Sequence, residues 1–136
     1  MPEGLSILMP VYDEIGTVEA AIEDALSAEL PLAARELVVV DDGSTDGTRG
    51  LLTSRDWPET VRVVLHERNR GKGAAVRTAL SHASLDLAAI FDADLEYPAR
   101  DLAPVLKPLV PGEAVEGSWT LWMGYGPPYA PPLPLM

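Results

Sequence analysis

Two aspartates one residue apart, Asp92 and Asp94, are the residues of this sequence best suited to chemistry. They directly follow an apolar run over residues 87–91, which predicts a buried strand, so the end of a rigid element would hold both carboxylates. Carboxylate oxygens are the ligands that Mg²⁺ or Mn²⁺ prefers. A metal held there could neutralise a diphosphate group as it leaves a sugar. Taken alone, a turn in which the carboxylates accept local hydrogen bonds explains the pair equally well.

A second pair of acids, Asp41 and Asp42, follows another apolar run. Gly43 permits a tight turn, and Ser44 or Thr45 would cap the helix that follows. In an open α/β sheet, ligands bind outside the carboxyl ends of the strands. One of the two carboxylates could therefore accept hydrogen bonds from a ribose or from the edge of a base. An ordinary strand-to-helix turn accounts for Ser44, but it does not account for two adjacent acids at this edge.

A glycine-rich segment, Asn-Arg-Gly-Lys-Gly at residues 69–73, follows a third apolar run. Its backbone N–H groups, its two cations Arg70 and Lys72, and the start of the next helix are all favourable for binding phosphate. The segment lacks the spacing of a P-loop, and no GxGxxG motif follows the first strand, so a dinucleotide site is disfavoured. That first strand ends in Pro-Val-Tyr-Asp-Glu at residues 10–14, which is suited to flanking a nucleobase or, alternatively, forms an ordinary loop.

His66 and His82 are the two histidines of the sequence. Neither has the serine and aspartate neighbours that suggest a hydrolase triad. His82 is expected on the exposed surface of a helix, and we assign no role to either histidine.

The composition is that of one folded domain without nucleic-acid-binding character. The 136 residues include 47% hydrophobic and 23% charged residues, as in soluble globular domains. The net charge of −11 argues against nucleic acid as a partner, because binding a phosphate backbone requires clustered lysine and arginine. The sequence has no cysteine, no signal-peptide pattern and no proline-free apolar stretch of ~18 residues. We therefore expect a cytoplasmic protein, at most peripheral to the cytoplasmic face of a membrane.

Apolar runs and helical spacing alternate along the chain. Four apolar runs predict strands over residues 5–11, 36–40, 61–66 and 87–91. Helices are expected after Thr17, after Ser44 or Thr45, over residues 73–83, and after Asp101, which would cap a helix carrying Leu102, Val105, Leu106 and Leu109. Strands that alternate with helices form right-handed crossovers and a mainly parallel sheet, so the predicted fold class is α/β.

The composition changes near Pro111. We place one domain over residues 1–110 and an irregular, proline-rich tail over residues 111–136, because no charged residue follows Gly117 and no strand or helix period persists. Two alternatives remain open. A shifted reading frame or truncation could have replaced the original sequence, or the aromatic residues could rest on a membrane interface, which we rank last. These aromatic residues are Trp119, Trp122, Tyr125 and Tyr129.

Taken together, four motifs resemble glycosyltransferase family 2, whose members have the Rossmann-like GT-A nucleotide-sugar-binding fold. The motifs are PVYDE at 10–14, VVVDDGSTDGT at 38–48, NRGKGAAVRTAL at 69–80 and FDADLEYP at 91–98. Their order and spacing are far more specific than any one of them. The sequence is most similar to the branch that transfers sugars to polyprenyl (dolichyl-type) phosphates.

The resemblance implies roles for individual residues. Pro10, Tyr12 and Glu14 would lie near the base of the donor, and Asp42, with its neighbour Asp41, would contact the base or the ribose. Lys72 would lie close to the phosphates or the nucleoside. Asp92 and Asp94 would act in catalysis by binding the donor and Mg²⁺ or Mn²⁺, and Glu96 would complete the metal shell.

The resemblance also implies a reaction. A sugar would pass from a GDP- or UDP-linked donor to a lipid phosphate at the membrane surface, by direct displacement with inversion at the anomeric carbon. A phosphate acceptor is already nucleophilic at neutral pH and needs less help from a general base than a hydroxyl.

The resemblance ends at Leu109, where the family continues with an acceptor-binding half. The alternative function is therefore a truncated, non-catalytic module that binds nucleotide sugars. A nucleotidyltransferase is disfavoured because no glycine-rich loop with arginine follows the first strand. The sequence does not indicate an oligomeric state.

Overall fold

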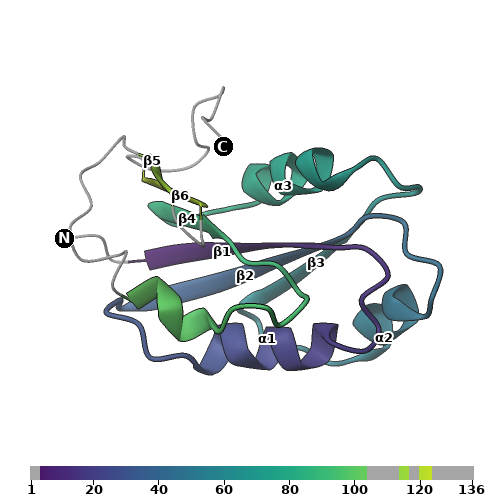
Figure 1. Ribbon diagram of the computed structural model, residues 1–136, viewed down its shortest axis with the longest axis horizontal. Coiled ribbons are helices and arrows are strands. Elements are labelled where there is room, and N and C mark those ends of the chain that lie inside the picture. The colour runs from purple at the N-terminus through teal and green to yellow at the C-terminus, as the bar shows by residue number, and fades with distance from the viewer. Residues whose placement is uncertain (1–3, 104–113, 117–119, 124–136) are drawn as a thin grey trace.

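A six-stranded sheet with helices on both faces organises the chain (Figure 1). The computed structural model describes residues 4–103, 114–116 and 120–123. Its elements are β1 (Gly4–Val11), α1 (Val18–Ser27), β2 (Ala34–Asp41), α2 (Thr48–Ser54), β3 (Val61–Leu65), α3 (Lys72–Ser81), β4 (Leu87–Ile90), the 3₁₀ helix η1 (Ala99–Leu102), β5 (Ala114–Glu116) and β6 (Thr120–Met123). The strand order is β3-β2-β1-β4-β6-β5. Strands β1 to β4 are parallel, which confirms the predicted α/β class.

Helices cover both faces of the parallel part of the sheet, with α1 and α2 on one face and α3 on the other (Figure 1). Successive side chains of a strand point to opposite faces, so β1 and β2 supply both cores. Ile7 and Val39 belong to the larger cluster, on the α1 face. Leu8 and Val38 belong to the smaller cluster, packed against α3. Burial on both faces explains why these strands appear in the sequence as continuous apolar runs.

Helices α1 and α3 begin within one residue of the positions expected, whereas the capping residues differ. Helix α1 follows Thr17, but this residue makes no side-chain capping bond. Helix α2 begins after Gly47, which has a left-handed backbone with φ of 103°, so the prediction that Ser44 or Thr45 caps it was wrong. The expected helix after Asp101 is described only as η1, which Pro98 precedes. Asp101 lies inside η1 and therefore does not cap it, and residues 104–109 lie outside the described residues.

Two short strands occur within the segment that was expected to be irregular. Strand β6 pairs antiparallel with β4, with Leu87 opposite Met123, and β5 pairs antiparallel with β6. The rest of that segment lies outside the described residues, including Trp119, Tyr125 and Tyr129. Among the residues that are described, no helix has the length and apolar character needed to cross a membrane.

Candidate functional site

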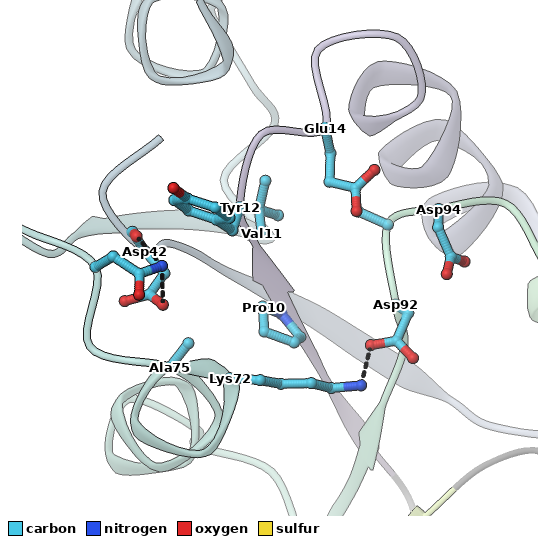
Figure 2. Close-up of a pocket in the computed structure, with 11 residues that line it drawn as sticks. Pro10, Val11, Tyr12, Glu14, Asp42, Lys72, Ala75, Asp92 and Asp94 are labelled. Carbon is cyan, nitrogen blue, oxygen red and sulfur yellow. Dashed lines mark hydrogen bonds and ion pairs between the residues drawn. The ribbon is translucent and has the colours of Figure 1, made fainter. Parts of the chain in front are cut away.

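A cavity of about 310 Å³ lies where β1, β2 and β4 end, beside the start of α3 (Figure 2). It brings together seven of the nine predicted site residues: Pro10, Tyr12, Glu14, Asp42, Lys72, Asp92 and Asp94. Val11, Asn69, Ala75 and Ala93 complete its lining. The carboxyl ends of parallel strands meet at one edge of the sheet, which is why motifs far apart in the sequence converge there. Asp41 and Glu96 do not line the cavity.

Asp41 and Asp42 point to opposite faces of the sheet, as neighbours on a strand do. The side chain of Asp41 is fully buried. Its Oδ2 accepts a hydrogen bond from the Ser44 N–H at 3.3 Å and lies 3.8 Å from Nε of Arg49. Its Oδ1 has no hydrogen-bond partner within the described part of the chain. Asp41 therefore supports the turn after β2 and lies outside the cavity lining.

Asp42 faces the cavity, and it also holds the glycine-rich segment in place. Its carboxylate accepts hydrogen bonds from the N–H groups of Arg70 and Gly71, both at 2.9 Å, and from the Asn69 side chain at 3.1 Å. Burial alone would raise the pKa of Asp42, but hydrogen bonds from His66, Arg70 and Gly71 outweigh it and lower the pKa. The N–H groups of Arg70 and Gly71, which the sequence suggested for binding phosphate, thus already donate their hydrogen bonds to Asp42.

His66 lies outside the cavity lining and holds the Asp42 carboxylate by a hydrogen bond, a function that was not assigned from the sequence. Its Nδ1 donates to Oδ1 of Asp42 at 2.8 Å, because a carboxylate only accepts, and its Nε2 lies 2.8 Å from the hydroxyl of Thr78 on α3. The ring is buried, with 6% of the residue exposed. The available signal was its position at the end of β3, the strand next to β2.

Lys72 and Asp92 form an ion pair across the cavity, with Nζ and Oδ1 2.7 Å apart. Figure 2 shows the lysine extending from α3 to the end of β4, with Asp42 on the other side of Pro10. The Lys72 side chain is 61% exposed and that of Asp92 48%, so water screens the pair and both groups are accessible to a ligand. One positive and one negative group at the same opening can bind a phosphate and a cation, respectively.

Asp94 lies on the turn after Asp92, where Leu95 has a left-handed backbone with φ of 62°. Its Oδ1 accepts a hydrogen bond from the Glu96 N–H at 3.0 Å, so the local turn anticipated as the alternative does form. Asp94 lines the cavity nonetheless. The backbone N–H of Glu96 contributes to this turn. Glu96 does not line the cavity, and this placement does not support a role in a metal shell.

The acidic residues at the cavity provide few ligands for a divalent cation by themselves. Within the described residues, no group of three or more His, Cys, Asp or Glu side chains is placed to hold a metal. Asp92 and Asp94 together offer two carboxylates at one opening. Mg²⁺ in phosphate-binding sites is usually held by one or two carboxylates, with substrate phosphates and water as its other ligands. The two aspartates therefore fit a metal that arrives together with a diphosphate.

The chain was compared with known proteins. The family model described as "Glycosyl transferase family 2" matches residues 6–128, which extends beyond Leu109, where the sequence analysis placed the end of the resemblance. A relative from Yersinia pestis (strain Pestoides F), undecaprenyl-phosphate 4-deoxy-4-formamido-L-arabinose transferase, is 32% identical over 117 residues. This alignment covers 84% of the chain and 36% of the relative, so the chain spans about a third of that protein's length.

Solved structures agree with the fold. The mannosyltransferase PcManGT from Pyrobaculum calidifontis, in complex with GDP-Man and Mn²⁺, is 33% identical with a TM-score of 0.63, covering 81% of this chain and 34% of that one. TarS from S. aureus, in complex with UDP, is 24% identical with a TM-score of 0.63 over 75% of this chain and 30% of that one, and supports the fold alone. With its parallel sheet, its cavity at the strand ends and a family match over most of its length, the chain belongs to glycosyl transferase family 2.

Proposed function

We propose that this chain forms the donor-binding part of an inverting, metal-dependent glycosyltransferase. Its donor would be a GDP- or UDP-linked sugar, and its acceptor a polyprenyl phosphate. The observation that carries this proposal is the convergence of Asp42, Lys72, Asp92 and Asp94 on one cavity. A cavity that offers a cation for phosphate, and two carboxylates for the metal that phosphate brings, is suited to a nucleotide diphosphate.

Different residues of the cavity would bind different parts of the donor. Tyr12, Pro10 and Glu14 would flank the base, and Asp42 would contact the base or the ribose. Lys72 would neutralise part of the diphosphate charge once it separates from Asp92. Asp92 and Asp94 would hold Mg²⁺ or Mn²⁺, which stabilises the charge of the departing diphosphate when bound.

Two similar proteins support the choice of substrates. The Yersinia relative is an undecaprenyl-phosphate sugar transferase, and the Pyrobaculum enzyme was solved with a GDP-sugar and Mn²⁺. An acceptor phosphate would attack the anomeric carbon, the bond to the diphosphate would break, and the configuration would invert. The acceptor phosphate is already negatively charged and needs little help from a general base. The main task of the residues of this chain would therefore be to position the donor.

Calorimetric titration with GDP and with UDP, each with and without Mn²⁺, tests the proposal. We expect one nucleotide to bind more tightly when Mn²⁺ is present. A turnover assay with the corresponding nucleotide sugar and a polyprenyl phosphate then separates an enzyme from a non-catalytic binding module. Absence of nucleotide binding would contradict the donor site, and equal binding without Mn²⁺ would contradict the role of the two aspartates.

Asp94→Ala is the sharpest variant for the metal. Because Asp94 lies on a turn at the sheet edge, we expect it to abolish Mn²⁺-dependent nucleotide binding while the thermal unfolding midpoint changes little. Asp56→Ala, at an exposed aspartate between α2 and β3, is the matched control and should bind as the unaltered chain does. A large loss of stability with unchanged binding in Asp94→Ala would overturn the assignment.

A further inference from the structure

The loops that follow β1 and β2 are joined by hydrogen bonds in both directions. The Asp13 N–H donates to Oγ of Ser44 at 2.9 Å, and the Thr45 N–H donates to Oδ1 of Asp13 at 2.7 Å. Two residues after Asp13, the Ile15 N–H donates to Oδ2 of Asp46 at 3.1 Å. We call these bonds among Asp13, Ser44, Thr45, Ile15 and Asp46 the loop clasp.

Asp13 is the centre of the loop clasp and not a lining residue of the cavity. Its backbone has a φ of 51°, a left-handed conformation that aspartate and asparagine tolerate better than most residues. Its neighbours on both sides, Tyr12 and Glu14, do line the cavity. The Asp13 carboxylate therefore holds the loop after β1 against the loop after β2.

Tyr12 directly follows β1, so the backbone at residues 12–13 sets where its side chain begins at the cavity wall. The residue is 46% exposed, and this loop is therefore part of what holds it in place. Glu14 is held in a similar way, because its N–H donates to Oγ1 of Thr48 at 3.1 Å. A loop fixed before the ligand arrives avoids the entropy cost of ordering it on binding.

We infer that Asp13 is a positioning residue for the donor, which acts by accepting the Thr45 N–H and so sets Tyr12 and Glu14 at the wall of the cavity. This inference rests on the proposed function. It makes a specific chemical demand: position 13 needs a hydrogen-bond acceptor and tolerance of a left-handed backbone, whereas negative charge is not required.

Three variants separate these demands. Asp13→Asn keeps the acceptor and the backbone tolerance, Asp13→Gly keeps the tolerance alone, and Asp13→Ala keeps neither. We expect calorimetry with Mn²⁺ and GDP or UDP to show Asn within about twofold of the unaltered chain and Gly weaker by about tenfold, the effect of losing roughly one hydrogen bond. Ala should bind more weakly than Gly, because it also loses the tolerance of the left-handed backbone. A purely conformational role would instead let Gly bind as Asn does, and would overturn the inference.

A second measurement addresses the loop clasp without any nucleotide. Amide hydrogen exchange at Thr45 should be faster in Asp13→Gly than in Asp13→Asn, because only asparagine can still accept that N–H. Ser44→Ala, which removes the acceptor of the Asp13 N–H, tests the clasp from the other loop if the Asp13 variants fail to fold. Its matched control is Ser54→Ala, a serine at the end of α2, which should leave nucleotide affinity unchanged.

The outcomes distinguish the two proposals. If the unaltered chain binds neither GDP nor UDP, the proposed function fails. If it binds and the Gly, Ala and Ser44→Ala variants bind equally well, the donor site stands and the inference about Asp13 fails. Unchanged exchange at Thr45 in Asp13→Gly would also overturn it.

Discussion

At the scale of single residues, the acids around the cavity have different tasks although the sequence presents them as equivalent. Asp92 and Asp94 stand at the opening, accessible to a ligand. Asp42 combines a face on the cavity with three bonds to the glycine-rich segment. Asp41 is buried on the other side of the sheet, and Asp13 braces a neighbouring loop. Asp13, Asp41 and Asp94 each accept one backbone N–H, so the number of hydrogen bonds does not separate their tasks. What separates them is position, because only Asp94 of the three lines the cavity.

His66→Ala tests the support behind Asp42. We expect it to lower the free energy of unfolding by about 1–3 kcal/mol, because the buried Asp42 carboxylate and the Thr78 hydroxyl would each lose a partner. Urea unfolding measures the change. His82→Ala, at the half-buried residue that follows α3, is the matched control and should cost less. Equal effects of the two substitutions would contradict a supporting role for His66.

At the scale of elements, β1 and β2 determine the site by lying side by side in register. Pro10 lies opposite Val40 and Val11 opposite Asp41, so the loops that follow the two strands start next to each other. This neighbourhood makes the loop clasp possible. On the other side of β1, the segment after β4 is tied to α1, because Asp24 accepts a hydrogen bond from the Ala99 N–H at 2.8 Å.

Val39→Ala tests the core beneath these loops. Val39 is fully buried in the middle of β2, so truncation should lower the free energy of unfolding by about 1–3 kcal/mol. Val61→Ala, on the edge strand β3 where the side chain is half-buried, should cost less. Denaturant unfolding supplies both values, and calorimetry should show nucleotide binding retained by the folded protein. Loss of binding in folded Val39→Ala would show that the core and the cavity are coupled.

At the scale of the whole molecule, acid should weaken the fold through particular carboxylates. Burial alone would raise the pKa of Glu36, but hydrogen bonds from Ser6 and Ser84 and the charge of Arg62 outweigh it and lower the pKa. The pKa of Asp42 is also lowered. A carboxyl group with a lower pKa in the folded state stabilises the fold above its unfolded pKa, about 4 for these residue types. That stabilisation is lost as the pH falls through the folded pKa.

Thermal unfolding between pH 7 and pH 3 checks this expectation. The midpoint should fall below about pH 4 in the unaltered chain. Glu36→Gln should lower the midpoint at pH 7 and reduce the subsequent fall, because the group no longer titrates. Glu59→Gln, at an exposed glutamate before β3, should follow the unaltered chain. A Glu36→Gln curve parallel to that of the unaltered chain would contradict the assignment.

The order of strands and helices could be predicted from the sequence because burial leaves a local record. Strands buried on both faces are continuous apolar runs, and helices show apolar residues at helical spacing. The convergence of the motifs after β1, β2 and β4 followed from the same pattern, since parallel strands end at one edge. Six of the nine predicted site residues line the cavity for this reason, and Lys72 joins them from the start of α3.

The use of each polar group depends on packing between segments that are far apart in the sequence. Ser44 serves the loop after β1 and not helix α2, and the N–H groups of Arg70 and Gly71 serve Asp42. These bonds join residues about thirty positions apart, and their formation depends on which strands are neighbours and on the direction of each side chain. The pairing of β6 with β4 likewise arises from an available strand edge and left no periodic signal. Local burial patterns predicted β1 to β4 and the sheet edge where these strands end. Strands β5 and β6 and the hydrogen-bond partners depend instead on packing between segments that are distant in the sequence.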